Sequence, residues 1–126
     1  MTKPFADIQD VLQRYYDGLY RGDVALLKTV FHEQARYHTA SQSPALHYDM
    51  PEYFDVVAAR QSPQSRGDAY GFDVETIRFA GDDTAFAAVS MTMMGKRYAD
   101  FLTFIRDGDA WRIVAKVFHY DTVGES

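Results

Sequence analysis

The chain has 126 residues, no cysteine and a formal net charge of −5 at neutral pH. This length supports one compact domain over residues 1–126, and the lack of cysteine excludes disulfides, thiolate metal sites and thiol nucleophiles. The acidic balance argues against nucleic acid or an anionic membrane as a partner. With no apolar run of membrane-spanning length and no signal sequence, we expect a soluble, cytoplasmic domain.

The first half of the sequence predicts three helices. Apolar residues recur at helical spacing over residues 4–20, which indicates an amphipathic helix that ends at Gly22. Asp23 can cap a second, shorter helix. Asp49 and Glu52 have the spacing of a capping box, so a third helix is expected to begin there and to fade about ten residues later.

The remaining segments predict strands and connections. Residues 35–39 read as a short strand, residues 40–48 as a loop, and residues 62–68 as a polar connection. The second half predicts an antiparallel meander of four long strands joined by short turns, at residues 69–79, 84–94, 96–106 and 110–121. The expected fold is therefore α+β, with three N-terminal helices, one short strand and a four-strand meander.

The last two strands are apolar on both faces, whereas an antiparallel sheet with one wet face alternates apolar and polar residues. One face is expected to meet the helices, and Tyr98 and Trp111 are assigned to it. We expect the other face, with Phe101, Phe118 and Tyr120, to pair with a second copy and form a homodimer. The alternative is a few stray aromatic residues on a partly exposed face.

The order of these elements resembles the nuclear transport factor 2-like superfamily, also called SnoaL-like or ketosteroid isomerase-like. The resemblance rests on IQDVLQRYYDGLYRGD (residues 8–23), LLKTVFHEQARY (26–37) and DGDAWRIV (107–114). YADFL (98–102) followed by WRIVAKVF (111–118) looks most like the branch named putative lumazine-binding. The resemblance implies a cone in which a strongly curved sheet surrounds the helices and leaves an apolar cavity for a small molecule. This scaffold hosts many functions, so it does not imply a reaction.

The resemblance also implies candidate catalytic residues. The first-helix tyrosine of ketosteroid isomerases matches Tyr15, and their second oxyanion donor matches Asp100. The isomerase base is missing, because the matching position is Thr39. A base would then be His38 or His119, since histidine titrates near neutrality, although His38 has the opposite strand parity to Thr39.

Less specific roles remain open for the same residues. Tyr15 can be a core tyrosine bound to a strand carbonyl, and Asp100 can pair with Arg97, Arg112 or Lys116 across the sheet. His119 can be a satisfied edge residue. The expected pocket lining is Tyr16, Tyr37, Thr39, Tyr53, Tyr98 and Leu102, and Met91, Met93 and Met94 either fill core gaps or line an adaptable pocket.

The sequence favours a domain that binds a small, largely apolar molecule without established catalysis. Its histidines lack metal-ligand spacing, and it has neither a glycine-rich phosphate loop nor a serine nucleophile elbow, so no metal or cofactor is expected. The first alternative is a cofactor-free acid–base isomerase, dehydratase or cyclase acting on a small carbonyl compound. The second is an association module whose pocket is filled by its own side chains. An open cavity beside Tyr15 would argue against this last alternative.

Overall fold

The structure, a computed structural model, describes residues 2–123. Its helices are α1 (Lys3–Arg21), α2 (Val24–Lys28), α3 (Met50–Ala59) and α4 (Pro63–Arg66). Its strands are β1 (Phe31–Thr39), β2 (Leu46–Asp49), β3 (Phe72–Ala80), β4 (Thr84–Met93), β5 (Lys96–Asp107) and β6 (Ala110–Thr122).

Helix α1 has the limits and the buried face that its sequence predicts. The Thr2 hydroxyl accepts a hydrogen bond from the Phe5 amide at the N-terminus, and Gly22 ends the helix in a left-handed conformation with φ of 67°. Asp23 caps α2, and Asp49 and Glu52 form the predicted capping box of α3. The apolar stripe of α1 is buried: Ile8, Val11, Leu12, Tyr15, Tyr16 and Leu19.

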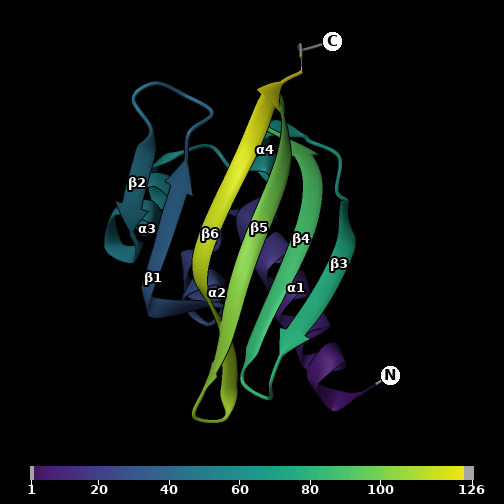
Figure 1. Cartoon of the computed structure of the whole chain (residues 1–126). Helices are drawn as coiled ribbons and strands as arrows, with labels where there is room; N and C mark the ends of the chain where they lie inside the picture. Colours follow the sequence, from purple (N-terminus) through teal and green to yellow (C-terminus); the bar gives the residue numbers. More distant parts are fainter. Residues whose placement is uncertain (1, 124–126) are drawn as a thin grey trace.

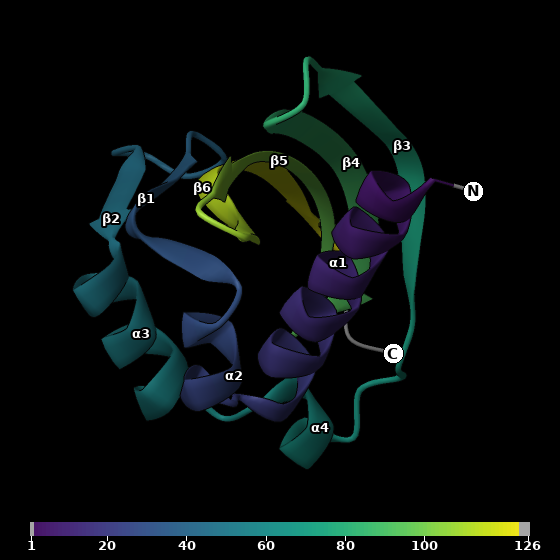
Figure 2. The ribbon, with the colours of Figure 1, turned by 90° about the horizontal axis from the view of Figure 1, so that it is seen from below.

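The six strands form one curved sheet in the order β2-β1-β6-β5-β4-β3. All neighbours are antiparallel except β1 and β6, which run parallel because two helices and most of the meander separate them in the chain. Figure 2 shows the sheet bending around α1, which crosses its concave face, while α2 and α3 lie beside β1 and β2. The predicted α+β fold, with N-terminal helices packed on a mainly antiparallel, curved sheet, is therefore confirmed.

The sheet has one strand more than the sequence predicts. Part of the expected loop over residues 40–48 belongs to β2, which pairs antiparallel with the end of β1 from Arg36↔Asp49 to Thr39↔Leu46. Four residues are too few to show a strand period, so their pairing depends on the free edge of β1. Strand β1 also begins earlier than expected, at Phe31, and the connection over residues 62–68 contains the single turn α4.

A β-bulge in β6 overturns the expected assignment of two aromatic residues. Phe104 pairs with Ile113 and Thr103 with Ala115, so one extra residue of β6 stands between these pairs. Because side chains alternate with a period of two, one extra residue places the second half of β6 on the opposite face from the predicted one. Phe118 and Tyr120 consequently lie on the concave face, packed with Tyr98, and cannot serve the outer face.

The hydrophobic core fills the space between α1 and the concave face of the sheet. Its largest fully buried side chains are Tyr15, Tyr16, Tyr53, Phe104, Ile8, Leu12, Leu27, Met50, Leu102 and Ile113. Within residues 2–123, no helix combines the length and the apolar character that crossing a membrane requires. Much of the aromatic content thus faces the interior.

We predict that Gly18→Ala destabilises the protein although alanine is the better helix former. A Cβ atom at Gly18 would lie 2.6 Å from Leu27 Cδ2, so α1 and α2 could not keep their close approach. Overpacking of this kind costs about 1–3 kcal/mol, more than the gain of about 1 kcal/mol in helix propensity. Urea unfolding measures the change. In a Leu27→Ala background the same substitution should cost less, and an equal cost in both backgrounds would exclude this contact as the cause.

Candidate functional site

A hydrogen-bonded pair of polar residues lies at the centre of the core. The Tyr15 hydroxyl donates to Asp100 Oδ2 at 2.5 Å, and the two residues are 0% and 1% exposed. The other carboxylate oxygen, Asp100 Oδ1, has no hydrogen-bond partner, and it is the one buried side-chain oxygen or nitrogen in this condition within residues 2–123. Burying a carboxylate oxygen without a hydrogen-bond partner costs free energy, so a hydrogen-bond donor that reached Oδ1 would stabilise it.

Lys116 completes the polar centre. It is 4% exposed, and its ammonium lies 3.8 Å from Asp100 Oδ2. Four aromatic rings surround this ammonium at 4.9–5.7 Å from their centroids: Tyr15, Tyr37, Tyr53 and Phe118. A cation over ring faces is attracted to the ring quadrupoles, so the ring cage and Asp100 together stabilise the charge of a buried amine.

Three elements bring these residues together. Tyr15 lies in the middle of the buried stripe of α1, and Asp100 lies on the concave face of β5. Asp100 pairs in register with Phe118, and Leu102 pairs with Lys116, so Lys116 stands diagonally across from Asp100. The β-bulge of β6 lets Ile113 and Lys116 both face inward, although their spacing would place them on opposite faces of a regular strand.

A small cavity adjoins this centre. Its volume is ≈ 20 Å³, which is room for about one water molecule. Asp100 and Lys116 form its polar wall, and the other lining residues are Leu19, Tyr37, Tyr53, Arg60, Met91, Met93, Met94 and Tyr98. Its three charged lining residues carry one negative and two positive charges.

Burial raises the pKa values of three tyrosines at or beside the cavity, Tyr15, Tyr37 and Tyr98. Burial is the main cause that raises the pKa of Tyr15 well above its usual value, and the nearby charge of Asp100 raises it further. Burial likewise raises the pKa of Tyr37, and it raises the pKa of Tyr98 to about 12. These phenols therefore remain protonated, and none of them supplies a base.

The structure brings together only some of the residues that the sequence singles out. Tyr15 and Asp100 are in contact, and Tyr37, Tyr53 and Tyr98 line the cavity. Tyr16 packs instead against β3, where its hydroxyl accepts from the Gly71 amide. Thr39 donates to the Phe118 carbonyl, and Leu102 is buried in the core away from the cavity lining.

Neither candidate histidine reaches the cavity. His38 lies on the outer side of β1, where its Nδ1 is 2.7 Å from Nδ1 of His47 on β2. His119 also faces outward and contacts Ser41 and Asp121. The structure thus gives neither histidine a position from which it exchanges a proton near Asp100. In the described part of the chain, no three His, Cys, Asp or Glu residues are grouped to hold a metal ion.

Sequence reasoning did not select Lys116 as a site residue, although the pairing of Asp100 with it was one of three alternatives. The structure confirms that alternative: Arg97 hydrogen-bonds to Thr92 and Ser90, and Arg112 donates to the Lys28 carbonyl. The available signal was the shared strand parity of Lys116 and the aromatic Phe118. It was missed because that face of β6 was assigned to the outside.

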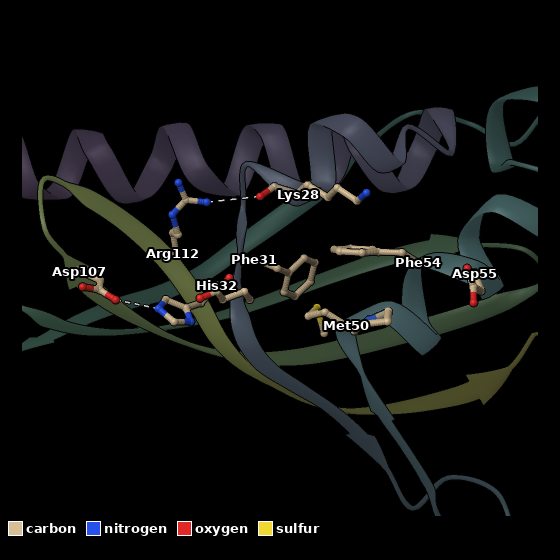
Figure 3. A pocket seen from close by; sticks show the side chains of 10 residues that line it. Lys28, Phe31, His32, Met50, Phe54, Asp55, Asp107 and Arg112 are labelled. Atoms are coloured by element: carbon tan, nitrogen blue, oxygen red, sulfur yellow. Dashed lines mark hydrogen bonds and ion pairs between the residues drawn. The ribbon is translucent and has the colours of Figure 1, made fainter.

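A larger groove, of ≈ 710 Å³, lies outside the cone between α2, α3, β1 and the β5–β6 hairpin. Figure 3 shows Phe31, Met50 and Phe54 grouped at its centre. His32 Nε2 lies 2.7 Å from Asp107 Oδ2 at one end of the groove. No buried side-chain nitrogen or oxygen among its lining residues lacks a hydrogen-bond partner, as judged within residues 2–123. The groove is larger than the cone cavity, but among the described residues it presents no buried, unpaired side-chain atom for a ligand to bind.

The fold is shared with solved structures of unknown function. An NTF2-like protein from Silicibacter pomeroyi is 23% identical, with a TM-score of 0.80 over 96% of this chain and 100% of that one. Another from Shewanella baltica is 20% identical, with a TM-score of 0.82 over 96% and 98%. A third from Methylobacillus flagellatus is 18% identical, with a TM-score of 0.84 over 97% and 95%. At these identities the likeness concerns the fold alone.

The family assignment comes from the sequence itself. No curated protein matches the chain. Residues 3–119, which include all the residues of the polar centre and its cavity, match the protein family described as "Putative lumazine-binding". The chain therefore belongs to this family, and it has the fold of NTF2-like proteins.

Proposed function

We propose that this protein binds a small molecule with a flat, largely apolar body in the cone cavity, with Asp100 and Lys116 recognising a polar edge of that molecule. The observation that carries the proposal is the unpartnered Oδ1 of Asp100 at the cavity wall. A buried ion pair rarely adds stability over apolar packing, so its presence beside a cavity favours a role in binding.

The charges of the site define the polar edge of the ligand. Asp100 Oδ1 accepts a hydrogen bond, and the ammonium of Lys116 and the guanidinium of Arg60 donate. An edge that carries an N–H group next to a carbonyl oxygen matches this arrangement. The family description names lumazine, a bicyclic dione whose imide has this edge, and lumazine is therefore the first probe to test.

Such a molecule is larger than the cavity, so the cavity wall has to move on binding. The movable part is a set of three methionines, Met91, Met93 and Met94, whose unbranched side chains adapt readily to different shapes. Arg60 and Tyr98 at the same wall are only partly buried. Tyr37 and Tyr53 stack with centroids 4.5 Å apart and form the firm part of the wall.

The turn between β4 and β5 supports a role of Met94 in the cavity wall. Met94 and Gly95 both have positive φ, 55° and 71°, which is typical of a type I′ hairpin that prefers Asn-Gly. A methionine at this position is strained by about 1–3 kcal/mol. The Met94 amide donates to Asp68 Oδ2 at 2.8 Å, which holds the strained turn in place.

The arrangement favours binding over the isomerase-like alternative. The hydroxyl of Tyr15 is directed to Asp100, and Asp100 is paired with Lys116. Tyr15 and Asp100 therefore do not present two donors to a substrate carbonyl, as an oxyanion hole requires.

We further propose that the protein is a homodimer through the outer face of β4, β5 and β6. Phe101 and Val117 are adjacent on this face and are 57% and 48% exposed, and Phe86 packs against Phe101. Ala88, which pairs with Phe101 on β4, and Thr103, two residues along β5, are uncharged. An isologous contact brings a patch against its own copy, so an uncharged apolar patch suits it.

We expect lumazine to bind to the wild-type protein and Asp100→Asn to weaken this binding about tenfold, the effect of about 1–2 kcal/mol for a mismatched buried hydrogen bond. In the variant the amide oxygen accepts from Tyr15, which leaves the amide N–H₂ facing the N–H of the ligand. Lumazine fluorescence or calorimetry measures the affinity. Asp73→Asn, at an exposed carboxylate, is the matched control.

A second ligand separates edge recognition from simple apolar binding. 1,3-Dimethyllumazine lacks the imide N–H and should bind more weakly than lumazine to the wild-type protein, and equally to the wild-type protein and Asp100→Asn. If neither compound binds at millimolar concentration, the proposed function is wrong. If the wild-type protein bound both compounds with equal affinity, the binding cavity would be supported, but Asp100 would not recognise the imide N–H of the ligand.

Met94→Asn should raise the melting temperature while it alters the affinity for lumazine. Asparagine relieves backbone strain of about 1 kcal/mol in the left-handed region, and it removes a flexible apolar side chain from the cavity wall. Calorimetric melting and lumazine titration give the two readouts. The control is Gly95→Ala in the same turn, which should lower the melting temperature. A lower melting temperature of Met94→Asn would mean that packing of Met94 outweighs its strain.

The wild-type protein should have the mass of a dimer in light scattering at tens of micromolar, and Phe101→Glu should be monomeric. A glutamate at this position would face its own copy and bury charge in the contact. Val74→Glu, at an exposed residue of the edge strand β3, should remain dimeric. A monomeric wild-type protein under these conditions would contradict the proposal.

A further inference from the structure

Lys116 combines three properties that the proposed binding role does not require together. Its primary amine is buried, it adjoins a cavity, and it lies beside a carboxylate that has a free acceptor atom. No hydrogen bond to its ammonium is present within residues 2–123, where only the ion pair with Asp100 and the four aromatic rings hold it. Amines in such dry surroundings are the ones that proteins use as nucleophiles.

We propose that Lys116 forms a Schiff base with small aldehydes or ketones that enter the cone cavity. The inference rests on the proposed function in that it uses the same cavity, and it names carbonyl compounds as the class of ligand. The carbonyl group that faces Lys116 then becomes bonded to it.

The step balances with the groups at hand. The ammonium of Lys116 gives a proton to Asp100, and the free amine attacks the carbonyl carbon to form a carbinolamine. Asp100 returns the proton to the hydroxyl group, which leaves as water, and a C=N bond forms. One carbonyl compound and one ammonium become one iminium ion and one water molecule, without an oxidant, a reductant or a net change in protons.

The residues around Lys116 stabilise the iminium product as well as the ammonium from which it forms. The iminium ion keeps the single positive charge of the ammonium, so the ion pair with Asp100 and the ring cage still stabilise it. Lys116 Nζ lies 3.8 Å from Oδ2 of Asp100, to which Tyr15 also donates, and Oδ1 has no hydrogen-bond partner within residues 2–123. The carboxylate therefore retains the acceptor capacity to take up a proton. The cavity has a volume of ≈ 20 Å³, so the smallest carbonyl compounds need the least movement of the methionines.

The rest of the molecule supplies the internal controls. The chain has four lysines, Lys3, Lys28, Lys96 and Lys116. Lys3 and Lys28 are exposed and Lys96 is half-buried, whereas Lys116 is buried. A reagent that reacts according to exposure alone should modify Lys116 last. Faster modification of Lys116 would therefore reverse the order that accessibility dictates.

The test is reductive trapping of the intact, folded protein with acetaldehyde and cyanoborohydride at neutral pH. Digestion and peptide mapping then show which lysines carry the ethyl group. We expect ethylation of Lys116 at least tenfold faster than that of Lys28. Asp100→Asn should slow the trapping at Lys116 at least tenfold and leave Lys28 unchanged, because proton transfer is lost. Lys116→Arg keeps the positive charge but should lose the fast adduct.

The outcomes separate this inference from the proposed function. Modification of Lys116 no faster than that of Lys28 would overturn the Schiff base, and retained lumazine binding in the same preparation would leave the binding proposal intact. If neither fast modification of Lys116 nor lumazine binding were observed, both the Schiff base and the proposed binding function would be wrong. The rates of modification at Lys116 and Lys28 are compared in the wild-type protein, so the test remains valid even if Lys116→Arg does not fold. Prior saturation with lumazine should protect Lys116 and not Lys28, which places both events in one cavity.

Discussion

The buried contact between Asp100 and Lys116 is the interaction on which the interior of this protein depends. Two charges in a nearly dry core are tolerated only when each compensates the other, and loss of one partner typically costs about 3–5 kcal/mol. The rest of the centre is arranged around this need: Tyr15 donates to one carboxylate oxygen, and four rings enclose the ammonium. The remaining oxygen of Asp100, a residue of the cavity wall, has no hydrogen-bond partner within residues 2–123. The stability of the core and the proposed binding therefore depend on the same few atoms.

The β-bulge of β6 makes that contact possible. A regular strand would direct Ile113 and Lys116 to opposite faces, whereas the extra residue between their pairing partners lets both face the helices. The same bulge moves Phe118 and Tyr120 to the concave side and leaves Val117 on the outer face beside Phe101. One inserted residue thus supplies the amine and part of its cage, and it also fixes the composition of the surface proposed for dimerisation.

The outer groove and the cone cavity differ in what they offer a ligand. The outer groove has more room, but within residues 2–123 its buried side-chain nitrogen and oxygen atoms already have hydrogen-bond partners. The cone cavity is small and has an unpartnered carboxylate oxygen, a caged amine and a wall of methionines. Size alone would favour the groove. Chemistry favours the cavity, because an unmet hydrogen bond at a movable wall rewards a ligand that supplies it.

Local sequence determined the helices and most of the sheet. The apolar stripe of α1, the caps at Asp23 and Asp49 and the short turn between residues 106 and 110 depend on neighbouring residues, and the structure has them where they were predicted. Strand β2, the bulge of β6 and the inward position of Lys116 depend on partners distant in the chain. Periodicity cannot reveal an extra residue that only pairing with β5 defines. The sequence alone therefore named Tyr15 and Asp100, and only the tertiary structure joined them to Lys116 and separated them from His38 and His119.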